Sequence, residues 1–163
     1  MDVTLAYGKT GLTIALPDEA DVTVVEPTYQ PGMPDPATAL ARALHEPIGS
    51  PPLRDLVSPD DRVGIAFSDI TRPTPNDLML PVLLDHLAHV PDQRITLFNG
   101  TGTHRANTEG ELRTMLGPSV VDRYRIVQND ARDRSTHVLV GTASTGNEIW
   151  LNREFVEASV RIL

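Results

Sequence analysis

The sequence has 163 residues and is acidic, with 14 Lys and Arg against 22 Asp and Glu and a net charge of −8. Neutralisation of phosphates by basic side chains supplies most of the affinity for nucleic acid. Aromatic residues, on which bases stack, make up only 4% of the chain. We therefore expect no nucleic-acid partner.

Cysteine is absent, which excludes disulfides, thiolate metal ligands and a cysteine nucleophile. No apolar run reaches the roughly 20 residues that span a bilayer, and the first residues lack the basic segment of a signal peptide. The sequence thus predicts a soluble, cytoplasmic protein with no membrane partner.

The N-terminal part predicts a β-hairpin followed by a proline-rich loop. Extended runs at residues 3–7 and 11–16 flank Gly8 and Gly11, which supply the positive φ that tight turns require. Residues 21–26 are rich in β-branched side chains and predict a third strand. The next predicted helix begins after Asp35 as N-cap, and a short second one covers residues 51–57.

From residue 35 onward, helices and strands alternate. Strands are predicted at 62–67, 94–99 and 124–127, helices at 76–89, 108–117 and 153–159, and a hairpin at 136–142 and 147–151. Such alternation is typical of an α/β fold, here one Rossmann-like domain over residues 1–163 with a mostly parallel sheet flanked by helices. Residues 160–163 look like the start of another strand, so we expect a longer protein.

Two polar loops follow neighbouring predicted strands, at residues 68–75 and 99–104. In open α/β sheets, ligands bind at the carboxyl ends of the strands. Asp69, Arg72 and His104 bring a carboxylate, a guanidinium and an imidazole to this edge. The guanidinium can hold an anion, and the imidazole is a credible general base because its pKa lies near working pH.

Simpler interpretations of these residues remain open. Asp69 and Arg72 also fit a surface ion pair, and Asp69 alone fits the cap of the next helix. His104 also fits a loop histidine that bonds to the backbone. Residues 100–103, Gly-Thr-Gly-Thr, form neither a Walker A loop nor the dinucleotide fingerprint, although their N–H groups and hydroxyls can bind a phosphate or carboxylate. His86 and His89 fit solvated side chains better than a metal site. The tryptophan at 150 fits a core or interface position.

Four motifs in order resemble the nickel-dependent lactate racemase family. They are Pro-Ile-Gly-Ser-Pro-Pro-Leu at 47–53, Ser-Asp-Ile-Thr-Arg-Pro-Thr-Pro at 68–75, Gly-Thr-Gly-Thr-His-Arg at 100–105 and Asn-Asp-Ala-Arg-Asp at 129–133. The opening at 7–12, Tyr-Gly-Lys-Thr-Gly-Leu, is also similar to that family. The resemblance covers essentially the whole chain but only the N-terminal domain of the family.

The resemblance implies a reaction and a set of site residues. In this family, two domains close over a nickel-pincer nucleotide, and a histidine takes the hydroxyl proton of a 2-hydroxy acid while hydride passes to the cofactor. His104 matches one of two alternating bases, Arg72 the arginine that holds the substrate, and Asp69 an acidic residue of the same site. Cofactor contacts are expected from Asp69, Thr71, Thr101, Gly102 and Thr103.

The family's second base, its tethering lysine and its nickel-ligating histidine match no residue here, so no metal ligand is expected in this chain. The resemblance therefore implies that the chain needs its missing C-terminal domain as a partner and, alone, neither holds the nickel cofactor firmly nor racemises lactate. The alternatives are a non-catalytic α/β module that binds a nucleotide or a small hydroxy acid, and a truncated structural fragment.

Overall fold

The computed structural model describes residues 1–163, which form two compact units, Met1–Gly32 and Met33–Leu163. None of the helices has the length and apolar character that crossing a membrane requires.

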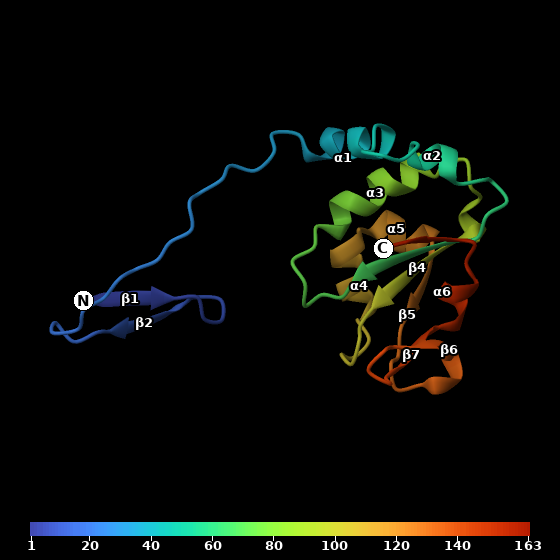
Figure 1. Ribbon diagram of the computed structural model, residues 1–163. Coiled ribbons are helices and arrows are strands. Elements are labelled where there is room, and N and C mark those ends of the chain that lie inside the picture. Colours follow the sequence, from blue (N-terminus) through green and yellow to red (C-terminus); the bar gives the residue numbers. More distant parts are fainter. The chain divides into compact units, whose positions relative to one another are not determined.

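The first unit contains the expected hairpin, β1 (Asp2–Leu5) and β2 (Leu12–Ala15), which pair antiparallel (Figure 1). Gly8 and Gly11 adopt φ of +57° and +80° in the connection, as expected from their place in the turn. The strand expected at 21–26 is wrong, because these residues pair with no strand. A β-branched run forms a strand only where a neighbour offers a hydrogen-bonding edge, and Val24 and Val25 remain exposed.

The second unit is built on a four-stranded parallel sheet with the order β5-β4-β3-β8. The central strands, β3 (Val63–Ser68) and β4 (Ile95–Gly100), pair along their whole length, with Ser68 opposite Gly100 at the last position. At the sides lie β5 (Arg125–Gln128) and β8 (Val160–Ile162). The α/β class, the parallel sheet with flanking helices and the N-terminal hairpin are therefore confirmed.

One face of the sheet carries the main hydrophobic core. Alternate residues of β3 and β4, such as Ile65 and Leu97, pack there against apolar side chains of α2 (Leu53–Leu56), α3 (Asn76–His86), α4 (Glu109–Leu116) and α5 (Pro118–Arg123). Helix α1 (Pro36–His45) has no buried residue and packs against α3. Helix α3 continues through Pro81, as expected. Helix α5 was not expected, although Pro118 occupies the first-turn position that proline favours.

The opposite face is covered by α6 (Arg153–Glu157), whose Phe155 meets Phe98 of β4 edge to face, with ring centroids 5.2 Å apart. The antiparallel strands β6 (His137–Thr142) and β7 (Glu148–Asn152) form the second expected hairpin. Short 3-10 turns at Asp92–Arg94 and Arg134–Thr136 precede β4 and β6. In Figure 1, α3 and α6 lie on opposite sides of the sheet.

Candidate functional site

Asp69 begins the first polar loop directly after β3, and its carboxylate is held in place by the loop itself. Its Oδ1 accepts hydrogen bonds from the backbone N–H of Thr71 (3.1 Å) and from the Thr71 hydroxyl (2.6 Å). The backbone N–H of Arg72 donates to the Asp69 carbonyl at 3.1 Å. The side chain of Asp69 is only 5% exposed. The loop therefore fixes a buried carboxylate at the carboxyl edge of the sheet.

His104, from the second loop, contacts this carboxylate. Its Nδ1 lies 2.5 Å from Oδ2 of Asp69, and its side chain is 50% exposed. The hydrogen bonds from the Thr71 hydroxyl, and next those from His104, lower the pKa of Asp69, so the carboxylate is ionised at neutral pH. An ionised carboxylate only accepts hydrogen bonds. Nδ1 therefore carries the proton, and Nε2 of the exposed ring is available to a ligand.

Arg72 occupies the same loop as Asp69 but does not pair with its carboxylate. Its side chain is exposed, and its guanidinium makes neither a hydrogen bond nor an ion pair within the chain. A loop whose backbone is held by Asp69 thus presents a cation that no carboxylate of the chain neutralises. Such a guanidinium can bind a carboxylate through two parallel hydrogen bonds.

The second loop is shaped by internal hydrogen bonds. The Thr101 hydroxyl donates to the Asn129 carbonyl, and the His104 N–H donates to the Thr101 carbonyl at 3.0 Å. Gly102 takes the left-handed conformation (φ +57°), with open space where a Cβ would lie. Of the residues expected to contact a cofactor, Thr71 and Thr101 use their hydroxyls inside the protein, whereas Gly102 and Thr103 are exposed.

A buried amide network, which the sequence did not reveal, anchors both ends of this loop. Asn99, fully buried at the end of β4, donates through Nδ2 to Oδ1 of Asn107 at 2.7 Å. Gln128 of β5 accepts from the Asn107 N–H (2.5 Å) and donates to the Asn107 carbonyl (2.8 Å). The only signal for it was a polar residue, Asn99, at the end of an apolar strand. Residues 99–107 are thus closed into a loop of fixed shape.

The other histidines noted in the sequence serve the backbone. His86 bonds through Nδ1 to the Val82 carbonyl at 2.9 Å, and His89 bonds through Nε2 to the Val57 carbonyl at 2.7 Å. Across residues 1–163, no three His, Cys, Asp or Glu side chains gather as metal ligands. Trp150 is not a core residue, because it lies half-buried with the Arg134 guanidinium 4.4 Å above its ring.

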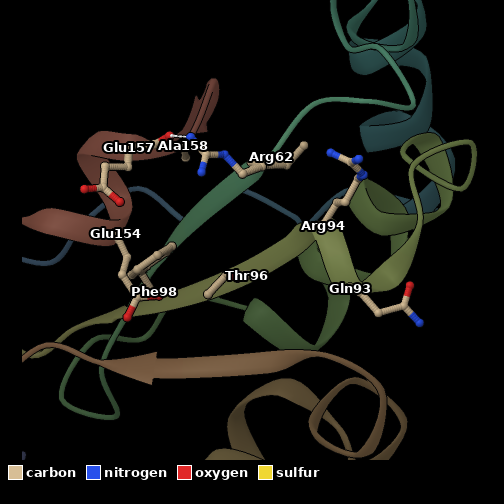
Figure 2. A pocket seen from close by; sticks show the side chains of 9 residues that line it. Arg62, Gln93, Arg94, Thr96, Phe98, Glu154, Glu157 and Ala158 are labelled. Atoms are coloured by element: carbon tan, nitrogen blue, oxygen red, sulfur yellow. Dashed lines mark hydrogen bonds between the residues drawn. The ribbon is translucent and has the colours of Figure 1, made fainter.

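A pocket of about 250 Å³ lies at the opposite end of the sheet, where the strands begin (Figure 2). Its two arginines bind carbonyls of their own chain: Arg62 donates to the Glu157 carbonyl (2.7 Å) and Arg94 to the Asp60 carbonyl (2.6 Å). Both are thus partly committed to structural contacts. The carboxyl edge, with its free cation and exposed imidazole, is the better candidate site.

The fold and this edge define a Rossmann-like α/β domain whose carboxyl edge carries a histidine–aspartate pair and, in the same loop as the aspartate, an arginine without an internal partner. Residues 7–163 match the family described as the lactate racemase N-terminal domain. The chain belongs to this family, as the four motifs led us to expect.

Two curated relatives are similar along nearly the whole chain. The lactate racemase of Thermoanaerobacterium thermosaccharolyticum is 30% identical over 165 residues, covering 99% of this chain. The lactate racemase of Lactiplantibacillus plantarum is 32% identical over 164 residues, covering 98%. In both cases the match spans only 38% of the relative. The chain therefore corresponds to well under half the length of these relatives.

Two solved structures share the fold. The lactate racemase apoprotein from Thermoanaerobacterium thermosaccharolyticum superposes with a TM-score of 0.81 at 29% identity, covering 99% of this chain and 38% of that one. A protein from Thermotoga maritima superposes with a TM-score of 0.63 at 21% identity, covering 82% and 34%. The second similarity concerns the fold alone.

Proposed function

We propose that this chain is the N-terminal part of the active site of a racemase acting on lactate or another 2-hydroxy acid, and that His104, Asp69 and Arg72 are its contribution to the reaction. The observation that carries the proposal is the 2.5 Å contact between Asp69 Oδ2 and His104 Nδ1. It fixes the tautomer in which Nε2 has a free lone pair, as a general base requires.

His104 removes the hydroxyl proton of the substrate through Nε2. Asp69 orients the ring and stabilises the positive charge that the ring gains on protonation. Asp69 is a positioning residue, because its carboxylate is buried and faces Nδ1 rather than the open side of the imidazole. The same pair returns the proton when the reaction reverses.

Arg72 binds the carboxylate of the substrate. An α-hydroxy acid carries its hydroxyl on the carbon next to the carboxylate, so one cation and one base at the same edge can hold both groups. Arg72 suits this role because its guanidinium has no partner within the chain. We assign no role in substrate contact to the arginines that already bind backbone carbonyls.

The lactate racemase family implies a nickel-pincer nucleotide. The residues present fit its nucleotide part at Gly102 and Thr103, which are exposed beside the site and leave room at the Gly102 α-carbon. They do not fit the metal, because no ligand cluster exists within residues 1–163. When bound, this cofactor would supply the hydride acceptor, which allows C2 to regain its hydrogen on either face and so to give either enantiomer. Its metal ligands, its tether and the second base belong to the C-terminal domain that we take to be the partner of this chain.

The test uses residues 1–163 joined to the remaining segment of the Thermoanaerobacterium thermosaccharolyticum lactate racemase and loaded with the cofactor. Conversion of L- to D-lactate is followed by chiral chromatography. We expect His104→Gln to lower kcat by at least about 100-fold, as the loss of a general base does. Arg72→Ala should chiefly raise KM. The chain of 163 residues alone should show no turnover.

His45→Gln and Arg54→Gln, which change exposed residues of α1 and α2, are the matched controls and should leave the rate unchanged. Racemisation within twofold of the parent by both His104→Gln and Arg72→Ala would remove the assignment. Lactate binding that depends on Arg72, without turnover in the longer protein, would favour the binding-module alternative.

A further inference from the structure

The hairpin of the first unit has one apolar and one polar face. In its register Val3 pairs with Ile14 and Leu5 with Leu12, which places four aliphatic side chains on one face. The opposite face carries the pair Thr4 and Thr13, whose hydroxyls lie 3.0 Å apart. Strands with such alternation cover a hydrophobic surface with one face and meet water with the other.

The apolar face of the hairpin is only partly buried. Leu5 is 48% exposed and Leu12 45% exposed. A two-stranded sheet alone is marginally stable at best in water, and needs further strands or a packed surface against its apolar face. The sequence nevertheless forms a regular hairpin with its turn glycines in place. These features are those of a docking element.

The segment after the hairpin is a spacer. Residues 17–32 contain no helix or strand, and include Pro17, Pro27 and Pro31. Proline-rich segments favour extended, semi-rigid conformations of about 3.1 Å per residue, so this one can span up to roughly 50 Å. The hairpin is therefore an arm that can reach a surface well away from its point of attachment.

A second copy of this chain is a poor occupant for the apolar face. Four side chains offer far less than the roughly 1,200–2,000 Å² that stable bimolecular interfaces bury. A surface within the same polypeptide needs much less contact, because the tether raises its effective concentration. The lactate racemases that match this chain continue well beyond the matched 38% of their length. Both observations favour a further domain of the same polypeptide as the occupant of the apolar face.

We propose that the apolar face of the β1–β2 hairpin, formed by Val3, Leu5, Leu12 and Ile14, docks onto the C-terminal domain of the racemase polypeptide and holds that domain to this one. The hairpin itself, residues 1–16, carries only two charged side chains, Asp2 and Lys9. The receiving surface is therefore apolar rather than charged. The proposal rests on family membership and on the length of the relatives, and is independent of the proposed reaction.

Hydrogen–deuterium exchange tests this contact. The 163-residue chain is compared with the longer protein used for the racemisation assay, without cofactor, and deuterium uptake is followed for peptides covering residues 1–16. We expect these amides to exchange at least about tenfold more slowly in the longer protein. Peptides from β3 and β4, protected in both, show that both proteins are folded.

Paired substitutions on the two faces separate docking from hairpin formation. Leu5→Thr with Leu12→Thr keeps strand propensity but removes the apolar face, and should return exchange to the rate of the short chain. Thr4→Val with Thr13→Val, on the opposite face, should leave protection intact. Equal exchange in the short and longer proteins, or protection unaffected by the leucine pair, would overturn the proposal. So would protection of the short chain that rises with its concentration, which identifies a second copy as the occupant.

Discussion

The carboxylate of Asp69 lies 2.5 Å from Nδ1 of His104, although the two residues are 35 positions apart in the sequence. The parallel register of β3 and β4 explains this contact. Ser68 and Gly100 are the last paired residues of β3 and β4, so both loops begin at the same level of the sheet. The second loop then turns back at Gly102, which brings the imidazole over the buried carboxylate. Two neighbouring strands thus assemble a pair that neither loop could form alone.

Asp69→Asn should release His104 from a single tautomer. Asparagine preserves the shape of the side chain but replaces the charged acceptor by an amide, so Nδ1 loses its strong partner. Nitrogen-15 NMR of histidine-labelled chain should show one dominant Nδ1–H tautomer in the parent and a mixture in the variant. Asp130→Asn, in a loop that follows β5, is the control and should change nothing. A His104 signal identical in parent and Asp69→Asn would contradict a positioning role.

Gly64→Ala should destabilise the second unit by about 1–3 kcal/mol, the usual cost of overpacking. A Cβ at this position would lie 3.0 Å from Cδ2 of Phe155 and 3.3 Å from the Cβ of Ala158, so these neighbours would have to shift by a few tenths of an ångström. Urea unfolding measures the effect. Gly110→Ala is the matched control, because its Cβ meets nothing within 4 Å and alanine favours the helix. That change should stabilise the chain slightly.

Much of the fold could be predicted because its signals are local. Apolar runs of strand length mark the three longer parallel strands, and the helix expected at 108–117 begins with a capping box formed by Thr108 and Glu111. The strand expected at 21–26 failed because strand formation depends on an edge that the sequence does not reveal. Helix α5 was missed because its six residues show too little periodicity.

The candidate site could be placed at an edge but not assembled from the sequence. Asp69, Arg72 and His104 could be assigned to the carboxyl ends of neighbouring strands by the βαβ pattern alone. The contact between Asp69 and His104 depends on register and on the shape of the second loop. That shape depends in turn on Asn107 and Gln128, which lie 21 residues apart and meet only after the sheet has formed. Spacing along the chain carries no signal for such long-range contacts.

Thr108→Ala should lower the free energy of unfolding by about 1 kcal/mol, the typical cost of losing a side-chain cap. The Thr108 hydroxyl accepts from the Glu111 N–H at 3.2 Å, and Glu111 accepts in return from the Thr108 N–H at 2.8 Å. Thr114→Ala on the same helix is the control, because its hydroxyl donates only to the Gly110 carbonyl within the helix. Thermal unfolding should separate the two variants. Equal melting temperatures would show that the cap contributes nothing measurable.

The Glu111 carboxylate should make the free energy of unfolding depend on pH in the acid range. Hydrogen bonds from the Arg105 guanidinium, and next from the Thr108 N–H, hold the pKa of Glu111 far below its usual range. In an unfolded chain the pKa of glutamate is about 4.3. The folded chain therefore binds this proton less readily than the unfolded chain, and the contribution of Glu111 to stability is complete above about pH 4.3. It is lost as the pH falls from there towards the folded pKa.

Urea midpoints at pH 6.5 and pH 3 should consequently differ more for the parent than for Glu111→Gln, which cannot titrate and retains part of the capping box. Glu157→Gln is the matched control, because the Glu157 carboxylate forms no ion pair or hydrogen bond, and its shift between the two pH values should equal that of the parent. An acid shift in Glu111→Gln as large as that of the parent would mean that other carboxylates account for the acid sensitivity. The bidentate contact with Arg105, at 2.7 and 2.8 Å, would then be a surface ion pair that contributes nothing measurable to the free energy of unfolding.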